Sequence, residues 1–272
     1  MDSIAPAVPL SDDYELNGLF SDDFGGTELD GAKWYPFYPD WEGRKLGRFV
    51  PENVSVKDGA LHLTAQIRES VPPAYRAAGY QPLTTALVRS RTRILYGLFQ
   101  MEFKAMPACL SSAFWLNDSL DADKKYKPGS FSDEIDIFEV FGKSTRGVED
   151  IYFNTCHRIG TPYKEGIIFS GITSFGSCKG RPEEKQPFHF SEGFHTASFL
   201  WEKDRLRWYL DGRLTFDHPN DYFHRPMYLN IDCEPLQDWC GALDPADLPA
   251  VYTIRYVRVW QKAQSSSEQE VL

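Results

Sequence analysis

The sequence contains no apolar run that approaches the roughly 18 residues of a membrane-spanning helix. The first 20 residues also lack the basic and apolar regions of a signal peptide. Helical periodicity is almost absent. Basic residues are in deficit, with 29 Lys and Arg against 39 Asp and Glu, which gives a net charge of −10. We therefore expect a soluble chain whose partner is neither nucleic acid nor an anionic membrane surface.

Cysteine is scarce, and its spacing excludes the usual zinc motifs. The five cysteines form no C-x-x-C pair and leave one over if the others pair. Cys233 and Cys240 could close a short loop by a disulfide, and buried free thiols are the equally open alternative. The other three cysteines are Cys109, Cys156 and Cys178.

Short strand-like runs between turn signals are the main feature of the chain. They cover residues 54–56, 60–65, 96–104, 151–155, 196–201, 206–210 and 252–261. Asp58-Gly59 and Asp211-Gly212 mark tight hairpins between such runs. This pattern predicts an all-β protein built as an antiparallel β-sandwich.

The length and composition fit one large domain. Nothing between residues 20 and 262 resembles a linker, so we expect an N-terminal extension at 1–19, a single domain at 20–263 and a flexible tail at 264–272. Aromatic residues make up 15% of the chain. That content is sufficient both for a sandwich core and for a surface that stacks on sugar rings.

One run, residues 134–139, carries three carboxylates among apolar residues. On a regular strand Glu134 and Asp136 share a face, whereas Glu139, five positions after Glu134, points the other way. A β-bulge at Ile137 or Phe138 would bring all three to one face. The alternative is a solvated edge strand, in which the acids protect against aggregation.

Such a row of acids has a definite chemical use. Like charges close together cannot all ionise freely, so one carboxyl keeps its proton near neutral pH. Retaining glycoside hydrolysis needs one ionised carboxylate as nucleophile and one protonated carboxyl as acid, roughly 5 to 5.5 Å apart. Glu134 and Glu139 suit that arrangement if the bulge is present.

The string EIDIFE resembles the active-site strand of glycoside hydrolase family 16 in its bulged form. YGLFQMEFKAMP (96–107), SAFWL (112–116), LRWYLDG (206–212) and YVRVWQ (256–261) resemble the surrounding strands in the expected order. The resemblance implies a curved, concanavalin-like jelly roll with a concave substrate cleft. It implies Glu134 as nucleophile, Glu139 as general acid and base, and Asp136 between them.

Sugar rings stack on aromatic side chains, and their hydroxyls need polar partners. Tryptophans are therefore the first candidates for substrate binding, with core packing as the alternative for each: Trp34, Trp41, Trp115 and Trp239. In the resemblance, Trp115 lies beneath the sugar next to the cleavage point. Trp41 and Arg44 lie in WEGRKLGRFVPENV, which resembles a cleft segment of the red-algal galactanases of this family.

Two further segments extend the resemblance. LNIDCEPLQDWCG (229–241) resembles the segment that brings a Glu and a Trp to the cleft of agarase-like and porphyranase-like members, here Glu234 and Trp239. His157, in FNTCHRIG, has a position at which these members offer His or Arg to the sugar. A single histidine is as often structural, so both roles stay open.

Three arginines in one run bear on the charge of the substrate. Arg89, Arg91 and Arg93 alternate along one run, and we expect them on a solvated convex face; if they border the cleft instead, their guanidinium groups would suit a sulfated polymer.

Many family members hold a structural calcium with an Asp just before the last strand. Here that residue is Arg255, so we predict no calcium there, and the chemistry needs no metal or cofactor.

The sequence therefore predicts an endo-acting retaining hydrolase of a β-linked red-algal galactan of the agarose, porphyran or carrageenan class. The alternatives are a laminarinase-type endo-β-1,3-glucanase and a lectin-like binding module without catalysis. Transglycosylation by the same covalent intermediate is also open. We expect a monomer that meets its polysaccharide outside the cytoplasm, secreted, periplasmic or on the cell surface, with the export signal absent from this chain.

Overall fold

The computed structural model describes residues 5–118, 131–160, 172–174 and 185–263. Its strands are β1 (Tyr14–Leu16), β2 (Trp34–Tyr35), β3 (Gly47–Phe49), β4 (Val54–Lys57), β5 (Ala60–Ile67), β6 (Leu83–Ser90), β7 (Gly97–Lys104), β8 (Ser111–Asn117), β9 (Phe131–Phe141), β10 (Phe153–Gly160), β11 (Ile172–Ser174), β12 (His195–Trp201), β13 (Arg205–Leu210), β14 (Arg213–Pro219), β15 (Tyr228–Glu234) and β16 (Ala250–Lys262). Short helices are α1 (Pro73–Ala77) and α2 (Gln237–Cys240), with 3-10 turns η1 (Pro51–Asn53) and η3 (Pro245–Asp247).

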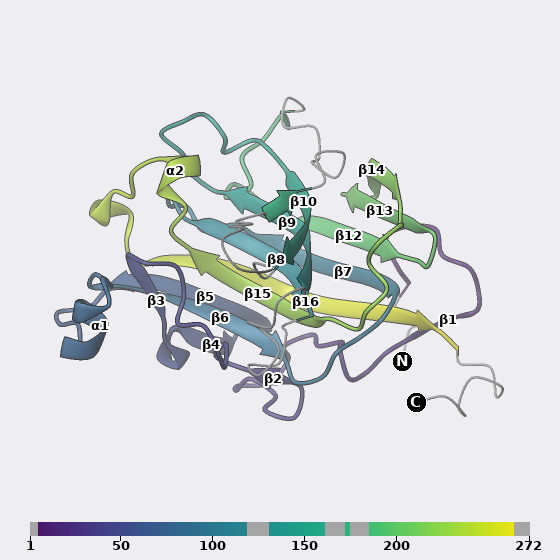
Figure 1. Ribbon diagram of the computed structural model, residues 1–272, viewed down its shortest axis with the longest axis horizontal. Coiled ribbons are helices and arrows are strands. Elements are labelled where there is room, and N and C mark those ends of the chain that lie inside the picture. Colours follow the sequence, from purple (N-terminus) through teal and green to yellow (C-terminus); the bar gives the residue numbers. More distant parts are fainter. Residues whose placement is uncertain (1–4, 119–130, 161–171, 175–184, 264–272) are drawn as a thin grey trace, which may run out of the picture.

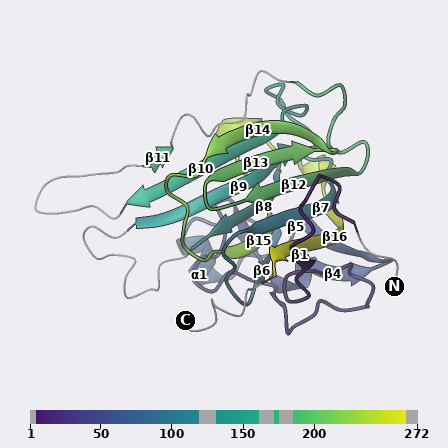
Figure 2. The ribbon, with the colours of Figure 1, turned by 90° about the vertical axis from the view of Figure 1, so that its right-hand side faces the viewer.

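The strands form one curled sheet that folds back on itself into two layers (Figures 1 and 2). The strand order is β11-β10-β9-β8-β15-β6 in one layer, then β5-β16-β7-β12-β13-β14 in the other. Every pairing of named strands in the described residues is antiparallel, except that of β3 with β6. The all-β, jelly-roll prediction is confirmed, and each predicted run overlaps a strand, although the run predicted at 151–155 corresponds to a strand at 153–160.

Hairpin turns form where the sequence predicts them. Asp58 and Gly59 both have positive φ (53° and 69°), as do Asp211 and Gly212 (49° and 76°). A two-residue turn of this kind matches the twist of the strands it joins, and Asp and Gly tolerate positive φ better than other residues. These turns set the register of β4 with β5 and of β13 with β14.

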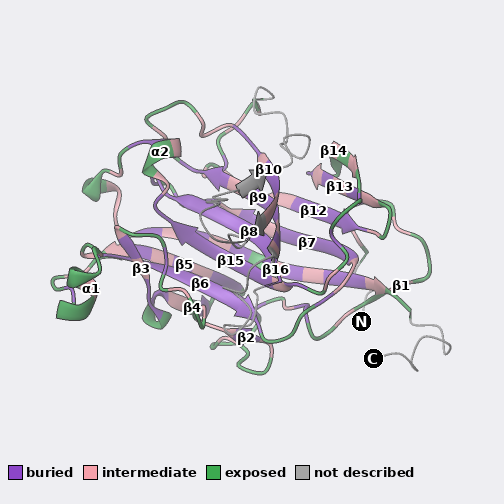
Figure 3. Cartoon of the chain, in the orientation of Figure 1, coloured by how far each residue is buried: buried purple, intermediate pink, exposed green. Residues whose placement is uncertain are grey.

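The core lies between the two layers. The ring of Phe103 on β7 stacks on that of Phe138 on β9, with centroids 4.2 Å apart, although the two strands are far apart in the sheet order. Trp201, Trp208 and Tyr252 are fully buried in the same core. Each such side chain contributes roughly 1.5 to 3 kcal/mol by burial. Figure 3 shows buried residues along the strands and exposed residues in the connections.

The N-terminal segment also forms a strand of the sheet. Residues 14–16, part of the predicted extension, form β1 and pair with residues 260–262 of β16. The long strand β16 continues beyond its pairing with β5, which would leave its edge open. β1 and the bridge from Asp22 to Val257 cover that edge, as edge strands require. The predicted tail 264–272 lies outside the described residues.

The four described cysteines are buried, and Cys109, Cys233 and Cys240 are free thiols. Of the two alternatives for Cys233 and Cys240, the structure has the free thiols, and the sulfur of Cys240 lies 2.8 Å from that of Cys109 instead. Cys178 lies outside the described residues. None of the helices in the described part of the chain has the length and apolar character needed to cross a membrane.

Candidate active site

A β-bulge interrupts β9 at Ile137, as the sequence predicts. Against β8, Phe138 lies opposite Phe114 and Asp136 lies opposite Trp115, so that Ile137 has no opposite residue. The register of β9 with β10 shifts at the same place. The extra residue is therefore present against both neighbouring strands.

A buried side chain supports the bulge. The amide of Asn154, on β10, donates a hydrogen bond to the carbonyl of Ile137. A carbonyl released from a strand ladder and buried without a partner would cost about 1 to 3 kcal/mol. Asn154 thus satisfies the group that the bulge takes out of the ladder.

The bulge changes which side chains share a face. Ile137 and Phe138 are both fully buried in the core, together with Ile135 and Val140. The alternation on either side of the bulge then turns Glu134, Asp136 and Glu139 to the opposite face of β9, which we call the acid face. The predicted grouping of the three acids follows from this one extra residue.

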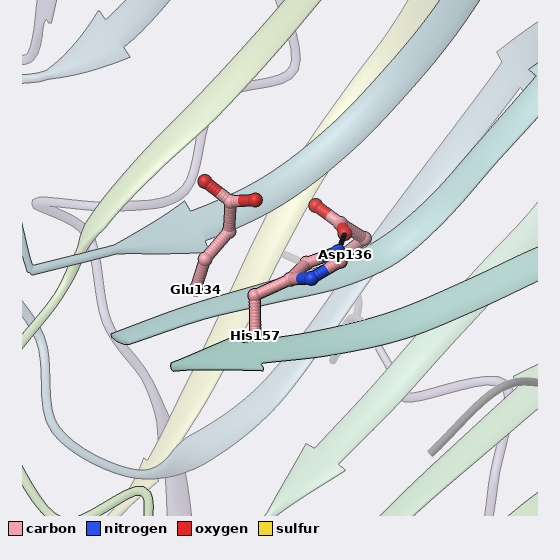
Figure 4. A group of neighbouring side chains, drawn as sticks. All are labelled: Glu134, Asp136 and His157. Atoms are coloured by element: carbon pink, nitrogen blue, oxygen red, sulfur yellow. Dashed lines mark ion pairs between the residues drawn. The ribbon is translucent and has the colours of Figure 1, made fainter. Parts of the chain in front are cut away.

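His157 joins the acids from the next strand. Figure 4 shows Glu134 and Asp136 on β9 with the His157 ring from β10 beside them. The Nε2 atom of His157 lies 3.2 Å from Oδ2 of Asp136, and ligand atoms of the three residues all lie within 4.8 Å of one another. Such a trio could hold a metal ion, but hydrolysis by two carboxylates needs none.

The environments of the two glutamates differ. Burial and the neighbouring charge of Asp136 raise the pKa of Glu134 to about 8, while His157 and Arg44 act to lower it. Burial raises the pKa of Glu139 well above its usual range, and the charges that contribute most are all carboxylates, with Asp136 first. Cationic neighbours thus favour the ionised form of Glu134, whereas the charges around Glu139 favour its protonated form, which is the asymmetry that a nucleophile and an acid require.

Two more carboxylates lie on the acid face, both from β15. Asp232 accepts a hydrogen bond of 2.6 Å from the indole N–H of Trp115, and Glu234 accepts one of 3.0 Å from Arg44. Burial raises the pKa of both groups, and for Glu234 the nearby Arg44 opposes the rise. Glu234 was predicted from the sequence, and Asp232 was not. The alternation of Asn230, Asp232 and Glu234 with apolar residues is the signal that could have found it.

Aromatic rings cover part of the acid face next to the acids. Trp115, 8% exposed, stacks on Tyr38 with centroids 6.3 Å apart and an interplanar angle of 12°. Trp41 meets both rings edge-on, at 5.7 Å from Tyr38 and 6.4 Å from Trp115. The structure thus brings Trp115, Trp41 and Arg44 to one region, together with Tyr38, and their contact with substrate stays a prediction.

The prediction for Trp34 is wrong. Its side chain is 0% exposed and belongs to the main core, where its indole N–H donates to Oδ2 of Asp22 over 2.9 Å. A fully buried ring offers no face to a sugar. Core packing, the alternative considered above, is its role.

Trp239 lies apart from the other predicted tryptophans. Its ring, half-buried on α2, packs against Phe153 at 4.5 Å and Phe141 at 5.4 Å. Phe153 is the residue opposite Glu139 on β10. Trp239 is therefore close to the Glu139 end of the acid face, and its contact with substrate stays a prediction.

The expectation of a solvated convex face is wrong for Arg89. This residue is 3% exposed and lies on β6 opposite Asn230, whose own opposite residue on β8 is Trp115. Its guanidinium is held between the rings of Tyr38 and Tyr228. The first arginine of the run thus lies on the acid face.

Arg255 and Arg258 occupy the other layer, on β16. Their guanidinium groups reach Glu102 at 3.3 Å and Asp23 at 2.9 Å, and Arg255 also stacks on the ring of Phe194. The carboxylates beside the position at which many family members hold calcium are thus paired with cations of the protein. These residues do not fit a calcium ion.

A comparison with known proteins identifies the family of this chain. The family model described as the GH16 domain of beta-porphyranases A–D matches residues 14–262. Beta-porphyranase B of Zobellia galactanivorans is 28% identical over 94% of this chain and 87% of its own length. The glucan endo-1,3-beta-glucosidase A1 of Niallia circulans is 25% identical over 91% of this chain and 38% of its own length.

Solved structures agree with the fold. The crystal structure of a beta-porphyranase from the human gut bacterium Bacteroides plebeius superimposes with a TM-score of 0.77, at 24% identity, over 94% of this chain and 95% of that one. Because the family model spans nearly the whole described sheet, from β1 to β16, the chain belongs to the beta-porphyranase A–D group of glycoside hydrolase family 16.

Proposed function

We propose that the protein is an endo-acting retaining hydrolase of a β-linked red-algal galactan, of the porphyran type. The observation that carries this proposal is the bulge at Ile137, because it alone turns Glu134, Asp136 and Glu139 to one face. The family match supports the substrate class, since its members are named as beta-porphyranases.

The two glutamates take separate parts in the reaction. Glu134, as the ionised carboxylate, attacks the anomeric carbon and forms a covalent glycosyl-enzyme bond, while Glu139 gives its proton to the departing glycosidic oxygen. Glu139, now ionised, takes a proton from water, and that water breaks the bond to Glu134. The protein ends in its starting protonation state.

Neighbouring side chains hold this pair ready. Asp136 lies between the glutamates along β9, and Nε2 of His157, 3.2 Å from its Oδ2, holds it in place. Trp115 offers its ring to the sugar beside the cleavage point, with its indole N–H fixed on Asp232. Arg44, Glu234 and Trp41 would contact neighbouring sugar units, and Trp239 units on the Glu139 side.

A reducing-end assay tests the proposal. We expect release of reducing ends from porphyran, agarose or a carrageenan, at a rate higher than from laminarin. The matched variants Glu134→Gln and Glu139→Gln remove one proton-transfer or nucleophilic group each without changing side-chain size. Both should lower turnover by orders of magnitude. Near-normal turnover in either variant would reject its role.

A β-1,3-glucanase is the second candidate, because the Niallia circulans relative is named as one and aligns over most of this chain. The rate of cleavage of laminarin decides between the galactanase and the glucanase. Rapid cleavage of laminarin without cleavage of any galactan would favour the glucanase. Tight binding of a polysaccharide with no product would instead favour a lectin-like module.

A polysaccharide cannot enter a cell before it is cut, so we also propose that the enzyme acts outside the cytoplasm. Fractionation of the producing cells with an antibody against this chain tests the location. Signal confined to the cytoplasm would contradict it.

A further inference from the structure

Two buried thiols lie close together near the Glu139 end of the acid face, and the hydrolysis uses neither of them. Cys109 lies in the connection between β7 and β8, and Cys240 is the last residue of α2. The two residues are 131 positions apart in the sequence, yet their sulfur atoms are only 2.8 Å apart. Their exposed fractions are 1% and 0%.

The two sulfur atoms are closer than packing alone requires. A buried free cysteine packs as a small apolar side chain, and non-bonded carbon atoms settle about 3.5 to 4.0 Å apart, with sulfur the larger atom. A disulfide bond has a length of about 2.05 Å. The sulfur atoms of Cys109 and Cys240, at 2.8 Å, would therefore have to approach by less than about 1 Å to bond. The thiol of Cys240 also donates to the carbonyl of Cys109 over 3.3 Å, so its side chain is directed at this segment.

Backbone contacts hold α2 in this position. The carbonyl of Cys240 accepts hydrogen bonds from the N–H of Thr145 over 2.9 Å and from the hydroxyl of Ser144 over 2.8 Å. The guanidinium of Arg146 donates to the carbonyl of Asp238 over 2.9 Å. Cys240 therefore cannot move away without the loss of contacts between α2 and the connection from β9 to β10.

The strand register excludes the pairing of Cys240 with Cys233. Asp232 and Glu234 lie on the acid face, so Cys233, between them on β15, points into the main core. Its sulfur lies 3.8 Å from the carbonyl oxygen of Ala86. Cys240 belongs to a separate apolar cluster, which it shares with Cys109.

We propose that Cys109 and Cys240 form a disulfide when the chain folds in an oxidising environment, and that this cross-link fastens α2 to the connection between β7 and β8. The two S–H bonds break and one S–S bond forms. The two electrons and two protons pass to the disulfide of an oxidant, such as glutathione disulfide, whose sulfur atoms become two thiols.

The bond should form during folding rather than afterwards. Burial, and then the hydrogen bond with Cys109, raise the pKa of the Cys240 thiol, so the thiolate that starts the exchange is scarce in the folded protein. The cross-link does not depend on which polymer the enzyme cleaves. Its presence in the cell rests only on the proposed location outside the cytoplasm, where disulfides persist.

The cross-link would stabilise one end of the acid face. Trp239 directly precedes Cys240, and its ring packs against Phe153 and Phe141. Phe153 lies opposite Glu139. A bond between residues so far apart in sequence removes much conformational freedom from the unfolded chain and so favours the folded state.

Peptide mapping tests the bond directly. The full chain is refolded in a mixture of reduced and oxidised glutathione, alkylated in denaturant and digested with trypsin and Asp-N protease without reduction. The digest places Cys109 in the peptide 105–117, Cys233 in 232–237 and Cys240 in 238–243. We expect 105–117 linked to 238–243, and the separate peptides after reduction. A link from 232–237 to 238–243, or only alkylated Cys109 and Cys240, would overturn the proposal.

Thermal unfolding in oxidising and in reducing buffer gives a second test, because each protein is its own reference and packing effects of a substitution cancel. We expect reduction to lower the Tm of the wild type by roughly 5 to 10 °C. Cys109→Ala and Cys240→Ala should lose that shift, and the matched control Cys233→Ala, which also removes a buried thiol, should keep it. Equal shifts in all four proteins would reject the cross-link. Neither measurement uses enzymatic activity, so a failure of the proposed hydrolase function leaves both results interpretable.

Discussion

The acid face should make the folded protein less stable as pH rises, and Glu134→Gln should remove part of that loss. Burial and Asp136 raise the pKa of Glu134 from 4.5 to about 8. A carboxyl whose pKa is raised by folding stabilises the fold most below its unfolded pKa, and that contribution disappears as pH rises through the folded pKa. The affected window is therefore pH 4.5 to about 8.

The magnitude follows from the width of that window. At pH 7 the difference is about 2.5 pH units, and each unit corresponds to about 1.4 kcal/mol, so the glutamine variant should gain about 3 kcal/mol relative to the wild type. The substitution also removes a charge that raises the pKa of Glu139. The lower pKa of Glu139 further reduces the loss of stability as pH rises.

Urea denaturation of both proteins at pH 5, 6, 7 and 8 measures this gain. Glu69→Gln is the control, because Glu69 is exposed and distant from the other acids in sequence. We expect the free-energy difference for Glu134→Gln to grow steadily with pH and that for Glu69→Gln to stay near zero. A difference for Glu134→Gln that is independent of pH would refute the electrostatic reasoning.

Three further substitutions test separate parts of the site. Asp136→Asn removes the leading charge that raises the pKa of Glu139, so the alkaline limb of the kcat/KM profile should move to lower pH; an unchanged limb would contradict this. His157→Gln removes a charge that lowers the pKa of Glu134, so the acid limb should move to higher pH, and movement to lower pH would disprove the assignment. Asp133→Asn breaks a buried ion pair, since Asp133 is 0% exposed and lies 2.7 Å from Arg158 and 3.0 Å from Arg225. It should cost about 3 to 5 kcal/mol of unfolding free energy in urea denaturation, and a loss below about 1 kcal/mol would show that the charges are better solvated than the structure indicates.

The bulge could be predicted because it solves a local problem. Three acids at positions 134, 136 and 139 cannot share a face on a regular strand, and the surrounding Ile and Phe residues need the opposite face for the core. The residues at 134–139 alone therefore show that the acids and the apolar side chains need opposite faces. The predicted hairpins have the same local character, since Asp58-Gly59 determines its turn without help from distant residues.

The errors arose where a distant residue decides the environment. Nothing near Trp34 shows that Asp22 will accept a hydrogen bond from its indole inside the core. The burial of Arg89 depends on Tyr38 and Tyr228, which come from segments far from β6 in the sequence. A charged residue in a strand is exposed unless such partners surround it, and only the assembled sheet brings them together.

Trapping of the covalent intermediate tests the central claim most directly. The protein would be incubated with a 2-fluoro galactan oligosaccharide that carries an activated leaving group, digested with protease and analysed by mass spectrometry. The account predicts one glycosyl adduct, on Glu134, and none in Glu134→Gln. An adduct on a different residue, or turnover of the natural polymer with inversion of the anomeric centre, would contradict it.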